Sequence, residues 1–274
     1  MRNTNIRLPQ SAETDVQQIT RPSRHYRYGY SRSSDCRRWS EPGQDYLTLA
    51  ERESSLSFVL CDGVSQSYEG GFAARFVGDR LLDWLLLFGE TAALPLGDGQ
   101  RLLNQFMKEL TKEANQCLQE QAISPSIQGL LREALSLKKE QGSATMYCGG
   151  RIDYPGTQHP NGRLLLVWQG DIRCRIWRDR NETTAELPGD LLSVRGQWNS
   201  AAGPVGGMPF WYCTELLQKQ RKGELLLYSD GFQALDRYPR VTGELLSELL
   251  ASETEHPSSD DISFLQVTWD FTSS

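Results

Sequence analysis

The stretch Phe58-Val-Leu-Cys-Asp-Gly-Val-Ser65 is an apolar run that stops at an Asp-Gly pair, and Leu225-Leu-Leu-Tyr-Ser-Asp-Gly-Phe232 has the same form. A short apolar run bounded by a turn signal predicts a buried β-strand. Asp62 and Asp230 are therefore expected just beyond two strands. Further acidic residues occupy the ends or connections of other predicted strands: Asp45, Asp171, Asp260 and Asp261.

Carboxylates at strand ends can meet at one edge of a sheet and hold a metal ion. Hard divalent ions such as Mg²⁺ and Mn²⁺ take oxygen ligands. A glycine after the aspartate, as at Gly63, lets the backbone approach closely enough for its carbonyl to join the ligands. Asp-Gly is also a common turn dipeptide, so a plain turn is the alternative interpretation of any single pair.

Other strands are predicted on both sides of a helical region. Residues 163–168 and 172–177 are expected to be antiparallel neighbours joined by Gln169-Gly170-Asp171. In the second of these strands, Ile172, Cys174 and Ile176 share one face. The remaining predicted strands are residues 46–49, 143–150, 224–228 and 262–269.

Apolar residues at helical spacing predict helices within residues 77–88 and 102–118 and, more weakly, 127–137. Pro95, Gly97 and Gly99 predict a break in the chain at residues 94–99. Thr242 is expected to cap a short helix. That helix carries Leu245, Leu246, Leu249 and Leu250.

The order of these elements favours an α+β layered domain over a doubly wound one, because short antiparallel connections dominate. Residues 1–25 are polar and lack periodicity, which predicts a flexible tail. Residues 26–274 are expected to form one domain.

Composition argues against several classes of protein. The chain has 274 residues, of which 38% are hydrophobic and 23% charged, so it can bury a sizeable core. A net charge of −6 argues against a general nucleic-acid binder. No apolar run approaches the roughly 18 residues that a membrane span needs, and the first ten residues have no apolar signal core. We expect no nucleic-acid or membrane partner.

The six cysteines are scattered and contain no CxxC pair, which predicts reduced thiols in a cytoplasmic protein. GxSxG, GxxxxGK[ST] and GxGxxG are absent, and the three histidines lie in polar or loop segments. A Ser–His or Cys–His hydrolase and a nucleotide-binding loop therefore have no support.

Taken in order, the acidic blocks resemble those of the metal-dependent protein phosphatases of the 2C type, in a bacterial form. The resemblance extends over residues 42–269. Its blocks are Pro42-Gly-Gln-Asp45, Phe58-Val-Leu-Cys-Asp-Gly-Val-Ser65 followed by Gly70-Gly-Phe-Ala-Ala74, Gly142-Ser-Ala-Thr145, Leu164-Leu-Leu-Val-Trp-Gln-Gly-Asp-Ile-Arg173, Leu225-Leu-Leu-Tyr-Ser-Asp-Gly-Phe232 and Asp260-Asp-Ile-Ser263.

The resemblance implies a β-sandwich of two mainly antiparallel sheets flanked by helix pairs, in four αββα layers. It implies a serine/threonine protein phosphatase that uses two Mn²⁺ or Mg²⁺ ions. The implied metal ligands are Asp45, Asp62, Asp230 and Asp260 with the Gly63 carbonyl, and Asp171 for a third ion. The implied catalytic group is a metal-bound water held by Asp45, Asp62 and Asp230.

Asp261 takes the place of the family's Asn or Asp beside the last ligand. The implied partner is a phosphoprotein, either a target of a serine/threonine kinase or the kinase itself.

One departure concerns the substrate phosphate. Many family members have an arginine five residues before the first acidic ligand, and here that residue is Ser40. Arg37 and Arg38 are the candidates to bind phosphate instead, with a solvated surface pair as the alternative. The missing arginine keeps open a catalytically silent, phosphatase-like module that binds a partner such as a kinase. An unrelated phosphoesterase acting on small molecules is a third, weaker alternative.

Overall fold

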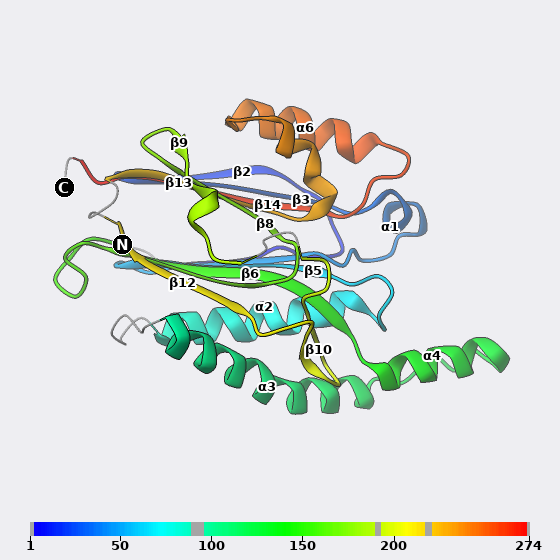
Figure 1. The fold of residues 1–274 in the computed structure, drawn as a ribbon. Coiled ribbons are helices and arrows are strands. Elements are labelled where there is room, and N and C mark those ends of the chain that lie inside the picture. The colour runs from blue at the N-terminus through cyan, green and yellow to red at the C-terminus, as the bar shows by residue number, and fades with distance from the viewer. Residues whose placement is uncertain (1–2, 89–95, 190–192, 217–220, 273–274) are drawn as a thin grey trace.

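The computed structural model describes residues 3–88, 96–189, 193–216 and 221–272. Within them the strands form two antiparallel sheets stacked face to face (Figure 1). Sheet A contains β1 (Thr4–Arg7), β4 (Tyr46–Glu51), β5 (Ser55–Gly63), β6 (Ala144–Asp153), β7 (Arg163–Gln169), β10 (Gln197–Asn199), β11 (Gly203–Val205) and β12 (Phe210–Glu215). Sheet B, in spatial order, contains β2 (Thr14–Arg21), β3 (Arg24–Ser31), β14 (Ile262–Asp270), β13 (Lys222–Tyr228), β8 (Arg173–Arg178) and β9 (Asn181–Glu182).

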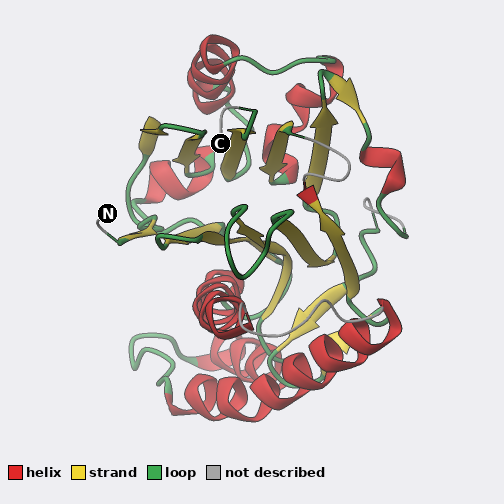
Figure 2. Cartoon of the chain, turned by 90° about the vertical axis from the view of Figure 1, so that its left-hand side faces the viewer, coloured by secondary structure: helices red, strands yellow, loops and turns green. Residues whose placement is uncertain are grey.

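Helices cover the outer face of each sheet, which gives the four layers seen end-on in Figure 2. The described helices are α1 (Ser34–Trp39), α2 (Gly70–Leu87), α3 (Leu96–Glu120), α4 (Gly129–Gln141) and α6 (Gly243–Glu255), with 3₁₀ segments η2 (Thr184–Glu186) and η3 (Asp230–Arg237). On sheet A the covering helices are α2 and α3. On sheet B, within the described ranges, one α-helix, α6, and the 3₁₀ segment η3 take the place of the expected pair.

The main core lies between the sheets, where strand residues of period two interdigitate. Leu47, Leu49 and Phe58 of sheet A meet Leu227 and Leu265 of sheet B there, all with no exposed surface. The predicted face of β8 is confirmed, because Ile172, Cys174 and Ile176 all belong to this core. The predicted α+β sandwich is thus confirmed.

The predicted helices are confirmed with shifted ends. Thr242 caps α6 as predicted, because its hydroxyl accepts a hydrogen bond from the Leu245 amide at 3.2 Å. The predicted break at residues 94–99 is wrong in part, since α3 already begins at Leu96 and contains Gly97 and Gly99. Gly99 lies against the Trp211 indole, so tertiary packing outweighs its low helix propensity. Residues 94 and 95 lie outside the described residues.

The prediction of a flexible tail over residues 1–25 is wrong, because two edge strands lie there. β1 pairs with β4, placing Ile6 opposite Leu49, and β2 pairs with β3, placing Ile19 opposite Tyr26. Alternate residues of β1 are only half-buried, and the rest are exposed. An edge strand of this kind shows almost no hydrophobic alternation, so the sequence pattern did not reveal it.

The predicted hairpin of residues 163–168 and 172–177 is also wrong. β7 pairs with β6 and β12 in sheet A, whereas β8 pairs with β13 and β9 in sheet B. The short connection around Gly170 therefore crosses from one sheet to the other. Hydrophobic alternation shows which face of each strand is buried, but not which strand is its neighbour.

Gly170→Ala is expected to destabilise the fold by about 2 kcal/mol or more. Gly170 has φ +108°, and an added Cβ would lie 2.4 Å from the Cβ of Met146. Gly156→Ala is the matched control, since its added Cβ meets nothing closer than 3.8 Å. Urea unfolding of both variants measures the difference, and equal stabilities would contradict this account of the crossover.

No helix in the described part of the chain has the length and apolar character to cross a membrane. All six cysteines are free thiols, as predicted, and Cys61, Cys148 and Cys174 are buried.

Candidate metal centre

The predicted aspartates line one cavity of about 640 Å³ at one end of the sandwich. Asp45 precedes β4 and Asp62 lies in β5, and these two strands pair with Tyr46 opposite Cys61. Asp230 follows β13 and Asp260 precedes β14, and there Tyr228 lies opposite Phe264. Antiparallel pairing places the start of one strand beside the end of the next, so these residues converge.

We call this the aspartate cavity and define it by its acidic lining. Eight carboxylates line it, while no Lys or Arg is found among the described lining residues. The eight are Asp35, Glu41, Asp45, Asp62, Asp171, Asp230, Asp260 and Asp261. Asp171 reaches the cavity because the crossover from β7 to β8 passes between the sheets there.

Burial and mutual repulsion disfavour the charged forms of these acids. Burial is the largest cause that raises the pKa of Asp62 well above its usual range, followed by the charges of Asp45, Asp230, Asp260 and Asp171. Burial likewise raises the pKa of Asp45, with Asp261 as the next cause. The Ser263 hydroxyl opposes this by donating to Asp45 Oδ2 at 2.7 Å.

The donor set suits a hard divalent cation. In the described residues, as they are placed, no three His, Cys, Asp or Glu side chains form a ready metal-binding group. The charged groups of the lining are nevertheless all carboxylates, which are the ligands that Mg²⁺ and Mn²⁺ take. Buried acids such as Asp45 and Asp62 have no cationic side chain beside them in the described lining. A bound cation would supply the positive charge that offsets theirs.

Two motifs that the sequence singled out hold the scaffold of the cavity. The Thr145 hydroxyl donates to the Asp62 carbonyl at 2.7 Å. The Ser143 hydroxyl donates to the Glu69 carbonyl at 2.7 Å, just before α2. A Cβ on Gly63 would lie 2.5 Å from the Gly70 backbone, so this position requires glycine, while the ligand role of its carbonyl stays a prediction.

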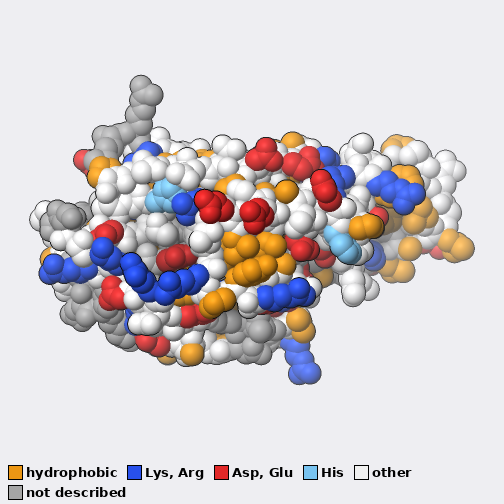
Figure 3. All heavy atoms as spheres, turned by 90° about the horizontal axis from the view of Figure 1, so that it is seen from above, with side chains coloured by type: hydrophobic (Ala, Val, Ile, Leu, Met, Phe, Trp, Pro, Cys, Tyr) orange, Lys and Arg blue, Asp and Glu red, His pale blue; other side chains and the backbone are white. Residues whose placement is uncertain are grey.

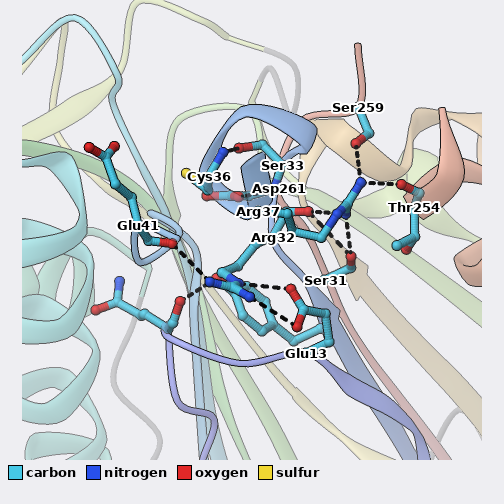
Figure 4. Close-up of polar contacts among 12 residues, drawn as sticks. Glu13, Ser31, Arg32, Ser33, Cys36, Arg37, Glu41, Thr254, Ser259 and Asp261 are labelled. Atoms are coloured by element: carbon cyan, nitrogen blue, oxygen red, sulfur yellow. Dashed lines mark hydrogen bonds and ion pairs between the residues drawn. The ribbon is translucent and has the colours of Figure 1, made fainter. Parts of the chain in front are cut away.

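Asp261 holds the segment that covers the cavity. Its Oδ1 accepts from the Ser33 amide at 2.5 Å, and its Oδ2 accepts from the Gln44 amide. Both ends of the segment that contains α1 are therefore fixed to one carboxylate, and Figure 4 shows the end at Ser33. This use of both oxygens distinguishes Asp261 from its neighbour Asp260 and fixes the backbone next to Asp45.

The structure does not bring Arg37 and Arg38 to the aspartate cavity. The Arg37 guanidinium donates to the carbonyls of Arg32 and Thr254 and to the hydroxyls of Ser31 and Ser259, at 3.1 and 3.3 Å for the hydroxyls (Figure 4). Arg38 is exposed and lies 5.3 Å from the centre of the Trp39 ring. The predicted phosphate-binding role is corrected accordingly, because Arg37 joins α1 to the end of α6.

Arg37→Ala is expected to lower the free energy of unfolding by about 1–3 kcal/mol, because two carbonyls lose a charged donor. Arg38→Ala is the matched control and should change it by less than about 0.5 kcal/mol. Urea unfolding of the two variants provides the test. Equal losses would contradict the assignment of Arg37 as the residue that joins α1 to α6.

Sequence reasoning missed the contribution of α1 to the cavity. Ser33, Ser34 and Cys36 line it, as does Met146 of β6. Ser33 caps α1, since its hydroxyl accepts from the Cys36 amide at 3.2 Å. A capping serine followed by arginines in the last turn is a helix signal that the sequence did contain.

Two stacked antiparallel sheets with acidic residues gathered at one end define the architecture of 2C-type protein phosphatases, and comparison with solved structures confirms that fold. The serine/threonine phosphatase Stp1 from Staphylococcus aureus is 13% identical with a TM-score of 0.57, over 96% of this chain and 98% of that one. RsbX, crystallised in complex with magnesium, is 10% identical with a TM-score of 0.55, over 93% and 100%. A single-site variant of a bacterial serine phosphatase is 15% identical with a TM-score of 0.52, over 94% and 99%.

No protein-family model matches the sequence, and no curated protein matches it. Structural likeness at such low identity shows the fold, so an argument about chemistry has to rest on the residues of the cavity.

Proposed function

We propose that the chain is a metal-dependent serine/threonine protein phosphatase that hydrolyses phosphoserine and phosphothreonine at the aspartate cavity. Two Mn²⁺ or Mg²⁺ ions would be held by Asp45, Asp62, Asp230 and Asp260 with the Gly63 carbonyl, and Asp171 would serve a third. The substrate would be a phosphoprotein, either a target of a serine/threonine kinase or the kinase itself.

The observation that carries this proposal is the charge of the cavity lining. A phosphate monoester carries about −1.5 to −2 charge at pH 7. Its approach to eight carboxylates is unfavourable when no Lys or Arg lines the described cavity. Divalent cations reverse that sign, so we infer that substrate binding at this place depends on them.

The residues of the chain supply position and orientation. Bound ions would contribute positive charge for the phosphoryl oxygens. They would also lower the pKa of a bound water, which would then supply hydroxide as the nucleophile for phosphorus. Ser263 orients Asp45 through Oδ2, and Thr145 fixes the backbone of Asp62. Asp261 holds the backbone on both sides of α1, which keeps the cover of the cavity in place.

A second candidate is a phosphatase-like module that binds a partner such as a kinase without turnover. Two observations favour it. Ser40 stands at the position of the family's arginine, and the Arg37 guanidinium donates hydrogen bonds to backbone carbonyls. The eight carboxylates argue against it, because a binding surface has no need of so many like charges.

Hydrolysis of a phosphothreonine peptide, with Mn²⁺ and with a chelator, tests the proposal. We expect turnover that needs Mn²⁺ and stops with the chelator. Folded protein that binds Mn²⁺ without turnover would favour the partner-binding module. Turnover that the chelator leaves unchanged would contradict the metal centre, and a strong preference for small phosphate esters would point to the third alternative.

A further inference from the structure

A second cavity, of about 680 Å³, lies on the outer face of sheet B. It occupies the end of the sheet away from the aspartate cavity, where β13 begins and β14 ends. α6 starts beside it, since Val241 and Thr242 are among its lining residues. In Figure 3 basic side chains gather toward this same end of the face that α6 covers.

The cavity contains a buried donor without a partner. His25 Nδ1 lies 3.0 Å from the Thr20 hydroxyl, and its Nε2 has no hydrogen-bond partner although it is buried. Either atom of this contact could be the donor, and we assign the hydroxyl as the donor to Nδ1, which leaves the proton on Nε2. A buried N–H with no acceptor is unfavourable, and a bound ligand oxygen would satisfy it.

Two arginines at the rim have no hydrogen bond or ion pair with the described residues. They are Arg180, in the turn between β8 and β9, and Arg240, just before α6. The Trp177 indole donates to the Pro239 carbonyl at 3.1 Å, so the residue next to Arg240 is held against β8. Arg180 follows Trp177 by only three residues, and both arginines therefore flank the same cavity.

The backbone of Arg180 is in an unfavourable conformation. Arg178 pairs with Asn181, so Asp179 and Arg180 form a two-residue turn, with φ of 44° and 74°. Such turns favour Asn or Asp first and Gly second. An arginine in the left-handed region costs stability, and residues of this kind are concentrated at functional sites.

The acidic residues around the cavity are largely neutralised by others. Asp270 forms an ion pair with Lys222 at 2.8 Å. Glu224 accepts from the Gln266 amide at 2.7 Å, and burial raises its pKa. Asp179 is the exposed carboxylate that opposes an anion here, because no ion pair engages it within the described residues.

We propose that this cavity binds a phosphate-type oxyanion through Arg180, Arg240 and the Nε2–H of His25. Two ligands carry such a group: free phosphate and a phosphorylated residue of a partner protein. The site is independent of the aspartate cavity, because its donors are cationic and neutral N–H groups and need no metal.

Titration of metal-free protein with inorganic phosphate, in the presence of a chelator and followed by NMR of the Trp177 indole and Arg180 amide, tests the proposal. We expect saturable shifts, and the double variant Arg180→Gly with Arg240→Gln should weaken binding at least tenfold. Arg180→Gly alone should raise Tm slightly, because glycine relieves the turn, which separates lost binding from lost folding. Asp179→Asn keeps the turn and should tighten binding two- to fivefold.

Arg237→Gln removes an exposed arginine outside the cavity and should leave the affinity within twofold. A phosphoserine peptide that binds tenfold tighter than both its unphosphorylated form and free phosphate would support a phosphorylated partner as the source. Equal affinities for free phosphate and the phosphopeptide would support the ion alone. No saturable binding of either probe, or unchanged affinity in the double variant, would overturn the proposal, and neither result depends on phosphatase activity.

Discussion

Asp230→Asn is expected to lower kcat/KM for a phosphothreonine peptide at least a thousandfold in the presence of Mn²⁺. Asparagine keeps the size of the side chain but removes the charge of a residue that follows β13 and lines the aspartate cavity. A thousandfold loss corresponds to about 4 kcal/mol of transition-state stabilisation, a typical scale for loss of a group essential to charge stabilisation. Mn²⁺-dependent peptide hydrolysis by the purified variant measures it.

Asp83→Asn is the matched control for this experiment. Asp83 is an exposed aspartate of α2, outside the aspartate cavity, so its variant should retain wild-type turnover. The Asp230 variant should stay folded, because the change removes like-charge repulsion from the cavity rather than a core contact. Wild-type activity in Asp230→Asn would contradict the proposed metal centre.

Removing the metal is expected to lower the melting temperature, and to lower it more as the pH rises above the ordinary pKa of aspartate, about 3.9. The folded-state pKa values of Asp45 and Asp62 are raised above the ordinary value near 3.9. A raised folded pKa favours folding while both states are protonated, and that contribution is lost as the pH rises through the folded pKa. At a pH above the folded-state pKa, each unit by which that pKa is raised corresponds to about 1.4 kcal/mol of lost stability.

Mn²⁺ should reverse this loss, since it binds the folded carboxylates. At a concentration one hundred times its Kd, a ligand adds about 2.7 kcal/mol of stability. For a chain of this size that corresponds to about 5 °C or more in Tm. Thermal unfolding with a chelator and with Mn²⁺, at each pH, provides the measurement.

Asp62→Asn is the matched variant for the pH series. It should melt higher than the wild type without metal, show a smaller fall with pH, and gain little from Mn²⁺. Identical melting profiles with chelator and with Mn²⁺ would contradict a cation site among these residues.

Part of the acidic site could be predicted because its signal is local. An apolar run that stops at Asp62 or Asp230 indicates that the residue lies at the end of a strand, and antiparallel pairing brings such ends together. The apolar residues at helical spacing that predicted α2 and α3 are local signals of the same kind, and so is the Thr242 cap. The layered α+β class therefore followed from the sequence before any pairing was known.

The tertiary structure alone decided which strands are neighbours and what each arginine binds. β7 and β8 belong to different sheets, and residues 4–7 and 14–21 are edge strands, because pairing depends on partners distant in the sequence. The absence of Lys and Arg from the described lining of the cavity likewise required the fold, since Arg37 is near Asp45 in sequence yet binds the Thr254 carbonyl. Residue type and periodicity fix which groups are available and which faces are buried, while long-range packing fixes which of those groups meet.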